Sequence, residues 1–522
     1  MGKGRNTGAR VTTARAGRFE LNSGTAVAAA VVFGALVRLV DIGAQSYSMD
    51  EIWEFTVIRL PAREIVKAGD GFPPLFHLMI HGMFAGGLGD ISARVLSAIL
   101  GIVTVWLASR LGRRIDPKLG AAAAFAVAVA PLLVLLSKEG RAYGLFILLA
   151  GLLLLATWDV IDTNTPRAWS GFIVVAVLGM YTHYMFSLAL VAAEIVIIYN
   201  MGRDPARWRR WLLGHCVLAV LLIPLVYVAI PDFGLDASND YSPTVGILEI
   251  GYAGLSLFTG TTLGPSTRAL HTAGSIAAIR SALPWVIMIG VPALYLAYLG
   301  WRALSTDWRI RLGVPFVVPV VLLSTISALV GTAFRVRYLS WLVIPLALWL
   351  AAGWLRGKGT LRHIAVGLLV LSSVIAMVTR DTIDDYRVED ARGAAHYIAD
   401  HPDLPAVGMA WYMTRPIEYY LGLTSATALP ATDGPDRFLY HQEPDDRIVP
   451  LPNLEDESHD VTAQDEVLDA AVPLGQEYLF VVTRQFHADP DGTYLDHRVA
   501  EDGLVPVAHF AGITIYKGVR GS

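Results

Sequence analysis

The sequence predicts a polytopic α-helical membrane protein that carries a small α/β domain at its C-terminal end. Of its 522 residues, 54% are hydrophobic and only 16% are charged. Many windows contain the roughly 20 apolar residues that a transmembrane helix needs, and charged residues become frequent only after Asp381. The sequence has no basic cluster with interleaved aromatic residues, which argues against a nucleic-acid partner.

The hydrophobic pattern predicts about eleven transmembrane helices. The predicted spans are residues 25–42, 91–109, 119–137, 142–160, 170–183, 184–200, 211–231, 284–301, 313–331, 339–355 and 363–379. Residues 72–88 form a shorter apolar segment that opens with a Pro-Pro pair, which suits the start of a helix. We expect this segment to lie at the outer membrane surface.

Basic residues gather in alternate loops, and the positive-inside rule places such loops in the cytoplasm. These residues are Arg110, Arg113, Arg114, Lys118, Arg167, Arg203, Arg207, Arg209, Arg210, Arg302, Arg309, Arg311, Arg356, Lys358 and Arg362. We therefore expect a cytoplasmic tail at 1–24, a transmembrane domain at 25–379 with outer loops at 43–90 and 232–283, and an extracytoplasmic domain at 380–522. The Ala-, Val-, Gly- and Arg-rich composition suggests a bacterial plasma membrane.

The outer loop 232–283 begins with a stretch rich in Pro, Asp, Asn and Ser and continues with an amphipathic segment, 245–258. We expect the amphipathic segment to lie on the membrane surface. Long polar loops often close over binding sites, so the polar start of this loop is a candidate lid.

The last 140 or so residues show the periodicities of a mixed domain. Helical spacing covers residues 388–399, strand patterns cover 406–411 and 478–483, and a hairpin is expected at 505–516. Alternating helices and strands predict a small α/β domain. The region has no Gly-rich phosphate loop or catalytic signature, so we expect it to have a structural or acceptor-guiding role.

Adjacent carboxylates, Asp50 and Glu51, follow the first predicted span in the sequence SMDEIWEF. Placing an acidic residue beside a membrane span costs free energy. A carboxylate at the boundary between water and lipid can act as a general base, and the second can bind a sugar hydroxyl, a metal or an arginine. The alternative is a solvated loop with two ordinary acids.

The motif SKEGRAY places Lys138, Glu139, Arg141 and Tyr143 in a turn between two strongly apolar spans. Charged groups in such a position normally pair with each other or meet a ligand. A site role and mutual pairing of Glu139 with Arg141 are both open interpretations of this turn.

The motif FRVRYLS places Arg335, Arg337 and Tyr338 between two late spans, on the predicted outer side. Two arginines there run against the positive-inside trend and indicate an anionic partner. A guanidinium group can bind phosphate with two hydrogen bonds, so a lipid phosphate is the natural candidate. The alternative is a structural pair with Asp50 or Glu139.

Three histidines are weaker candidates for binding a ligand or a metal. His183, in GMYTHYMF, lies at the outer end of two short apolar segments, where it is either an interfacial residue or a contact to a phosphate or metal. His77 and His81 are four residues apart on the segment that follows the Pro-Pro pair, so they can share one helix face. Two metal ligands and an ordinary amphipathic face both fit that spacing, which leaves a divalent metal possible.

Several of these motifs, taken in order, resemble the GT-C membrane glycosyltransferases. The similarity is to the bacterial branch that resembles dolichyl-phosphate-mannose-protein mannosyltransferases and lipid A aminoarabinose transferases. The matching stretches are SMDEIWEF, GFPPLFHLMIHGMF, GDISARVLSAILG, SKEGRAYGLFILLAG, GMYTHYMF and FRVRYLSWLVIPLALWLAAGW.

The resemblance implies a GT-C fold and an inverting transfer from a polyprenyl-phosphate-linked sugar on the outer face of the membrane. It implies that Asp50 is the catalytic carboxylate with Glu51 as its neighbour. It also implies that Arg141 and either Arg335 or Arg337 contact the donor phosphate. Many relatives have Lys or His directly before the Pro-Pro pair, whereas this chain has Phe72, so that donor contact is in doubt.

The function expected from these residues is transfer of a sugar, with mannose or a pentose favoured, to a cell-envelope glycolipid, polysaccharide or protein. A phosphate leaving group needs little further activation, so a divalent metal is optional. The rival hypothesis is a transporter or lipid flippase in which Asp50, Glu139 and His183 relay protons. Transporters usually show internal repeats and polar residues at mid-membrane, and the sequence shows neither.

Overall fold

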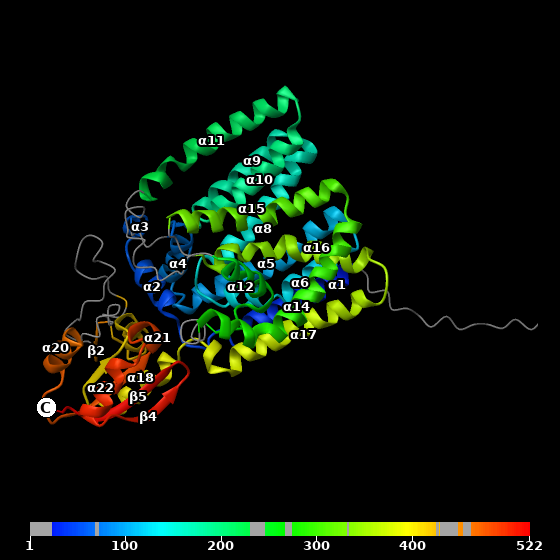
Figure 1. The fold of residues 1–522 in the computed structure, drawn as a ribbon. Helices are drawn as coiled ribbons and strands as arrows, with labels where there is room; N and C mark the ends of the chain where they lie inside the picture. The colour runs from blue at the N-terminus through cyan, green and yellow to red at the C-terminus, as the bar shows by residue number, and fades with distance from the viewer. Residues whose placement is uncertain are drawn as a thin grey trace, which may run out of the picture.

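The computed structural model describes residues 23–67, 72–229, 246–266, 274–330, 334–423, 427, 447–452 and 461–521. It consists of a helical bundle and a smaller sheet-containing domain at the C-terminal end (Figure 1). The bundle helices are α1 (Ser23–Leu39), α2 (Met49–Ile58), α3 (Ala62–Ile65), α4 (Leu75–Ala85), α5 (Ile91–Ile115), α6 (Leu119–Ala128), α7 (Pro131–Ser137), α8 (Tyr143–Thr163), α9 (Pro166–Met180), α10 (Phe186–Met201), α11 (Pro205–Ala229), α12 (Ile247–Thr259), α14 (Gly274–Ala303), α15 (Thr306–Val330), the 3-10 helix η3 (Val336–Leu342), α16 (Val343–Arg356) and α17 (Leu361–Thr382).

Each predicted span coincides with one of these helices or with a pair of consecutive helices. In the described residues, seven helices are long and apolar enough to cross a membrane, and the bent pair α6–α7 makes an eighth. The remaining predicted spans match α1, α9 and α10, which are apolar but shorter. The predicted class, a polytopic α-helical membrane protein, is confirmed.

The bend between α6 and α7 has an identifiable cause. The two helices meet at 60°, because Pro131 begins α7 and cannot donate a backbone hydrogen bond. The fully buried guanidinium of Arg38 donates to the carbonyl oxygens of Val127 at 3.2 Å and Ala128 at 3.1 Å, and to the Ser137 hydroxyl at 3.2 Å. Arg38 thus occupies carbonyl groups that the end of α6 leaves without helical partners.

The predicted surface segment 72–88 forms α4, which has only 11 residues. At 1.5 Å per residue this helix is about 16 Å long, which is too short to cross a hydrocarbon core of about 30 Å. Its position at the membrane surface stays a prediction. The predicted amphipathic segment 245–258 corresponds to helix α12, whereas the candidate lid at the start of loop 232–283 lies outside the described residues.

The C-terminal domain is built on a five-stranded sheet with strand order β2-β1-β3-β5-β4. Strand β1 pairs in parallel with β2 and β3, while β5 pairs antiparallel with β3 and β4. Residues on both faces of β3 are buried, because helices cover the sheet. This arrangement confirms the predicted α/β fold. The elements are η4 (Asp384–Tyr386), α18 (Ala391–Ala399), β1 (Ala406–Gly408), η5 (Trp411–Met413), α19 (Thr414–Tyr420), β2 (Ile448–Pro450), α20 (Thr462–Ala471), β3 (Glu477–Thr483), α21 (Gln485–Ala488), α22 (Thr493–Asp502), β4 (Val505–Phe510) and β5 (Ile513–Val519).

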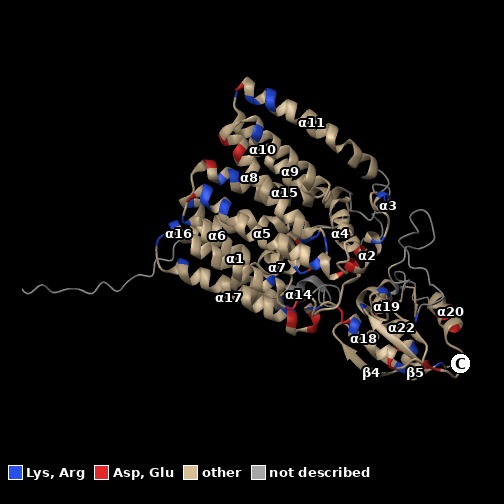
Figure 2. Cartoon of the chain, turned by 180° about the vertical axis from the view of Figure 1, so that it is seen from behind, with Lys and Arg blue, Asp and Glu red and all other residues tan. Residues whose placement is uncertain are grey.

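The C-terminal domain contacts the loop that connects α1 to α2. The Tyr47 ring stacks on Tyr420, with ring centroids 6.1 Å apart, and the Tyr47 amide donates to the Tyr420 hydroxyl at 2.7 Å. The Ser46 hydroxyl donates to the Asp390 carboxylate at 2.9 Å, and the Tyr419 hydroxyl donates to Asp90 at 2.7 Å. The domain lies at the end of the bundle opposite the start of α1 (Figure 2). The C-terminal domain therefore stabilises the loop that leads into α2.

Candidate active site

Helix α2 positions the candidate base, because Asp50 lies in its first turn. Ser48 caps the helix, and its side chain and that of Glu51 form a capping box. The N-terminal end of a helix favours a negative charge. The local sequence S-M-D-E therefore fixes the start of α2 and the direction of the Asp50 side chain.

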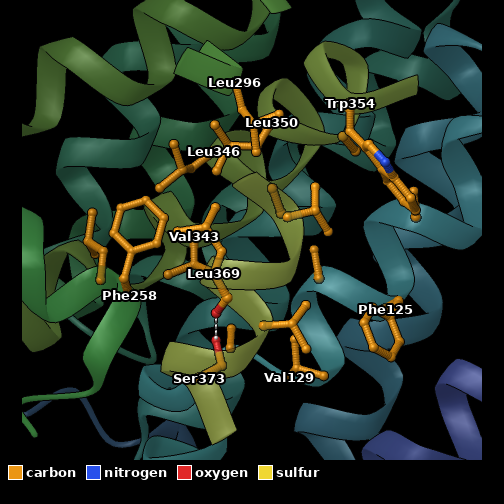
Figure 3. A pocket seen from close by; sticks show the side chains of 18 of the residues that line it. Phe125, Val129, Phe258, Leu296, Val343, Leu346, Leu350, Trp354, Leu369 and Ser373 are labelled. Carbon is orange, nitrogen blue, oxygen red and sulfur yellow. Dashed lines mark hydrogen bonds between the residues drawn. The ribbon is translucent and has the colours of Figure 1, made fainter. Parts of the chain in front are cut away.

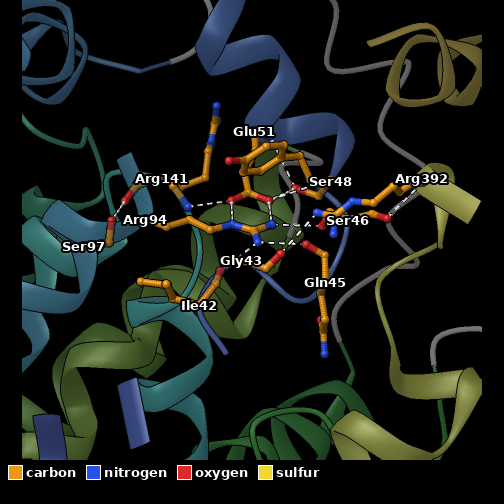
Figure 4. A network of polar contacts seen from close by, with 12 residues as sticks. Ile42, Gly43, Gln45, Ser46, Ser48, Glu51, Arg94, Ser97, Arg141 and Arg392 are labelled. Atoms are coloured by element: carbon orange, nitrogen blue, oxygen red, sulfur yellow. Dashed lines mark hydrogen bonds and ion pairs between the residues drawn. The ribbon is translucent and has the colours of Figure 1, made fainter. Parts of the chain in front are cut away.

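Glu51 is occupied by structural contacts. It is only 1% exposed, and its carboxylate accepts two hydrogen bonds from the Arg94 guanidinium, at 2.6 Å and 2.8 Å. The backbone amides of Gly140 and Ser48 donate to it at 2.9 Å and 3.0 Å (Figure 4). Of the roles considered for the second acid, the structure shows the contact with an arginine, and we interpret Glu51 as a residue that positions the loop.

Arg94 of α5 contacts both α2 and the loop before it, and the sequence did not indicate this role. Besides binding Glu51, its guanidinium donates to the carbonyl oxygens of Ile42, Gln45 and Ser46 at 2.9 to 3.0 Å. One buried arginine therefore holds both the loop before α2 and the first turn of α2 (Figure 4).

Asp50 forms an ion pair with Arg337, with 3.0 Å between Oδ2 and Nη1. Its side chain remains 52% exposed, so the carboxylate is accessible. The surrounding protein opposes its ionisation, but Arg141 and Arg337, with a smaller effect from Arg335, hold the pKa of Asp50 well below its usual range. Asp50 is therefore ionised at neutral pH. The side chain of Arg335 is itself exposed.

Arg141 lies on the other side of Asp50 and is buried. Its Nη1 donates to the Asp50 carbonyl oxygen at 2.9 Å and to the Glu54 carboxylate at 3.4 Å. Its guanidinium also lies 4.4 Å from the centre of the Phe72 ring. The sequence left open an ion pair between Glu139 and Arg141. The structure does not show it, because Arg141 forms its ion pair with Glu54.

Glu54 is a second residue that the sequence reasoning missed. It is one turn beyond Asp50 on α2, is 1% exposed, and lies 2.6 Å from Nδ1 of His77. His81 lies 2.8 Å from the Ile58 carbonyl oxygen. These two histidines thus attach α4 to α2. Within the described ranges, no group of three or more His, Cys, Asp or Glu side chains is arranged to hold a metal ion.

His183 lies in a cluster of aromatic rings and is only 4% exposed. Its ring centre is 5.0 Å from that of Phe72, 5.7 Å from Tyr143, 5.1 Å from Phe146 and 5.4 Å from Tyr338. The cluster thus brings two predicted site residues, Tyr143 and Tyr338, against the histidine. The Arg337 guanidinium lies 5.4 Å from the centre of the Tyr143 ring, which connects the cluster to Asp50.

The hydrogen bonding of His183 defines its chemical state. The Met185 amide donates to Nδ1 at 3.1 Å, so Nδ1 carries no proton and Nε2 carries one. Burial, reinforced by Arg141 and Arg337, lowers the pKa of His183 to about 3. His183 is therefore a neutral donor at Nε2, an atom with no hydrogen-bond partner among the described residues.

Lys138 and Glu139 lie on the turn between α7 and α8, and both are partly buried. Burial raises the pKa of Glu139, while Arg337 and Arg380 act in the opposite direction. Neither residue forms an ion pair within 4 Å in the part of the chain that the structure describes. The charge of Glu139 is thus influenced both by Arg337 at the candidate site and by Arg380 near the end of α17.

Comparison with known proteins adds independent findings. The family model for dolichyl-phosphate-mannose-protein mannosyltransferase matches residues 72–230. The structure of ArnT from Cupriavidus metallidurans in the apo state matches with a TM-score of 0.54 and 15% identity, covering 95% of this chain and 98% of ArnT. No curated protein sequence matches.

Two further structures match less closely. ArnT from the same organism bound to undecaprenyl phosphate has a TM-score of 0.42 and 17% identity, over 95% of this chain and 98% of ArnT. The arabinofuranosyltransferase AftD from Mycobacteria has a TM-score of 0.40 and 17% identity, over 96% of this chain and 42% of AftD.

The helical bundle and the match to apo ArnT define a membrane protein with the GT-C fold. Within that class, the chain resembles the dolichyl-phosphate-mannose-protein mannosyltransferases and ArnT.

Proposed function

We propose that the protein is an inverting glycosyltransferase that moves a sugar from a polyprenyl-phosphate donor to a cell-envelope acceptor. The observation that carries the proposal is an accessible, ionised carboxylate, Asp50, placed 3.0 Å from the Arg337 guanidinium, with Arg141 bound to the backbone carbonyl oxygen of the same residue. A general base and two phosphate-binding groups are what such a transfer needs. The matched family model, named for a dolichyl-phosphate donor, supports the same donor class.

The reaction is a direct displacement at the anomeric carbon. The acceptor oxygen attacks that carbon and gives its proton to Asp50, while the bond from the carbon to the phosphate oxygen breaks. The electron pair leaves with the lipid phosphate, whose charge Arg337 and Arg141 stabilise, with Arg335 nearby. Preorganised cations of this kind are usually a large part of catalysis.

The ion pair between Asp50 and Arg337 also couples donor binding to base strength. A carboxylate whose pKa is held low is a weak base. When the donor phosphate attracts Arg337, Asp50 loses part of the positive charge that stabilises its ionised form, so its pKa rises. Asp50 is thus a better proton acceptor after the donor has bound than before.

Tyr338, Tyr143 and His183 supply the rest of the proposed donor site. His183 offers a neutral N–H to a phosphate or sugar oxygen once an aromatic neighbour moves aside. Phe72, where many relatives have a cation, stacks with Arg141 and helps to orient it.

The rival hypothesis of a transporter or flippase requires His183 to take and release protons. Burial lowers the pKa of His183 to about 3, and its Nδ1 accepts a hydrogen bond from the Met185 amide, so the neutral ring is favoured at neutral pH. This geometry favours a transferase site at the membrane surface over a proton relay through the membrane.

We infer that the sugar is mannose or a pentose, that the acceptor is a glycolipid, polysaccharide or protein, and that a divalent metal is optional for the reaction. We further infer that the protein lies in a bacterial plasma membrane with the C-terminal domain outside. The division into a tail at 1–24, a transmembrane domain at 25–379 and an outer domain at 380–522 belongs to the same proposal.

The test is an assay of the purified protein in liposomes with a panel of polyprenyl-phosphate sugars, with and without a chelator. Release of free polyprenyl phosphate from one donor supports the proposal. Failure to consume any donor, when envelope extracts are supplied as acceptors, contradicts it.

A further inference from the structure

A long groove follows one side of helix α17, and its inner part is apolar. This part lies between α6, α12, α14, α16 and α17 (Figure 3). Phe125, Phe258, Leu346, Trp354 and Leu369 are among the side chains that line it. Such a lining fits a hydrocarbon chain and offers few partners for a polar ligand.

The groove continues toward the C-terminal end of α17, where the end of α1 and helix α7 form its other walls. This second part shares Pro131 with the first. Its walls are mostly apolar, with Thr259 and Thr262 among them, and the charged residues Asp41, Lys138, Arg380 and Asp381 lie at the mouth.

The groove is long enough to hold an acyl chain of a membrane lipid. Fifteen residue steps along α17 separate Val366 in the inner part from Asp381 at the mouth, which corresponds to about 22 Å of helix. Half of a hydrocarbon core is about 15 Å deep. One acyl chain can therefore lie in the groove while its headgroup stays at the mouth.

The four charged residues at the mouth are of both signs and remain available. In the described part of the chain, none of them forms an ion pair within 4 Å, although the Gln45 amide donates to Asp381 at 2.8 Å. Burial, the largest influence, lowers the pKa of Lys138, which indicates a partly desolvated ammonium group. Two cations and two carboxylates complement a headgroup that carries a phosphate and an ammonium group.

We propose that this groove is a binding site for a zwitterionic aminophospholipid, of the phosphatidylethanolamine type. Lys138 and Arg380 bind its phosphate, Asp41 and Asp381 bind its primary ammonium group, and an acyl chain lies along α17. A carboxylate can accept hydrogen bonds from a primary ammonium group but not from a quaternary one. The site therefore selects against phosphatidylcholine, and it selects against phosphatidylglycerol because that lipid has no ammonium group.

This site is separate from the candidate active site but close to it. Lys138 and Arg141 are three residues apart on one turn, so their Cα atoms are at most about 11 Å apart. Lys138 faces the groove, whereas Arg141 contacts Asp50 and Glu54. The lipid headgroup is thus on the same side of the membrane as Asp50.

The proposal is tested by titrating the purified full-length protein with phosphatidylethanolamine, phosphatidylcholine and phosphatidylglycerol of identical chains, with bound lipid counted by native mass spectrometry. We expect phosphatidylethanolamine to bind about fivefold or more tightly than the other two, a preference of roughly 1 kcal/mol. The double variant Lys138→Gln/Arg380→Gln should weaken its binding about tenfold. The double variant Asp41→Asn/Asp381→Asn should abolish the preference over phosphatidylcholine.

A steric pair of variants checks the apolar part of the groove. Val374 lines the groove and Leu371 does not, yet the two are 46% and 50% exposed on the same helix. Val374→Trp should block lipid binding, whereas the matched control Leu371→Trp should not. Equal binding by both tryptophan variants, or binding by Lys138→Gln/Arg380→Gln within about twofold of the wild-type protein, overturns the proposal.

The donor lipid provides the last arm of the test. Undecaprenyl phosphate should bind together with phosphatidylethanolamine, because the two sites are distinct. One-for-one displacement would assign the groove to the donor and overturn the proposal. These are binding measurements, so their outcome does not depend on whether transfer activity is found.

Discussion

The variant Asp50→Asn separates a catalytic role of Asp50 from a structural one. The substitution keeps the size and shape of the side chain but removes its charge and its capacity to accept a proton. If Asp50 is the general base, transfer should fall by about 10²- to 10⁴-fold, equivalent to roughly 3–5 kcal/mol of transition-state free energy.

The structural cost of the same change should be small. The ion pair that is lost joins side chains that are 52% and 32% exposed, and pairs of this kind typically contribute about 0–1 kcal/mol. The capping box of α2 uses Ser48 and Glu51 and remains intact. The thermal midpoint of the variant should therefore stay close to that of the wild-type protein, so a large loss of activity cannot be explained by unfolding.

The affinity for the donor distinguishes loss of the base from a general loss of folded enzyme, because only an unfolded variant should fail to bind the donor. Removing the carboxylate leaves Arg337 without its 3.0 Å partner, so undecaprenyl phosphate should bind the variant as tightly as the wild-type protein or more tightly. Binding is measured by titration calorimetry, and transfer by release of polyprenyl phosphate. Asp400→Asn, at an exposed position directly after α18 in the C-terminal domain, is the matched control. Transfer by Asp50→Asn at more than about a tenth of the wild-type rate would refute the assignment of the base.

The remaining predictions concern pH, the histidine and the buried ion pair. Because the pKa of Asp50 is lowered, the carboxylate stays charged until pH falls below the usual range for Asp, so kcat/KM should be level from pH 7 to about 5. Arg337→Ala should raise that pKa and move the acidic limb of the pH profile to higher pH, and an unmoved limb would argue against the pairing. His183→Gln, which keeps an N–H donor, should retain more donor affinity than His183→Phe, and equal losses in the two variants would remove the donor role. Arg94→Met leaves Glu51 buried and unpaired, which should destabilise the protein by about 3–5 kcal/mol, seen as a lower thermal midpoint in detergent; an unchanged midpoint would contradict this.

The parts of the fold that the sequence predicts well depend on local patterns. Long apolar segments such as α8 and α15 are recognisable because a membrane helix satisfies its own backbone hydrogen bonds. The C-terminal hairpin β4–β5 is recognisable from its alternating residues. Strand β2 was not predicted, because it has only three residues and obtains its hydrogen bonds from β1.

The candidate site was predictable only in outline. Asp50, Arg141 and Arg337 come from three distant segments, yet their motifs marked each of them, and the structure places Asp50 in contact with both arginines. Arg94 and Glu54 carried no such signal, because their importance comes from partners 43 and 23 residues away. The separation of the adjacent acids into an accessible Asp50 and a buried Glu51 follows from the helical turn that begins at Met49, which composition cannot reveal.

The contact between the C-terminal domain and the loop before α2 has a consequence for biosynthesis. Ser46 and Tyr47 bond to Asp390 and Tyr420, which are 344 and 373 residues later in the chain. At a translation rate of 5–20 residues per second, the ribosome needs roughly 20 to 70 s to make that stretch. A nascent protein therefore inserts its helices well before the C-terminal domain can contact the loop before α2. A chain that ends before α18 should insert into the membrane but lack the contacts that position this loop and Asp50.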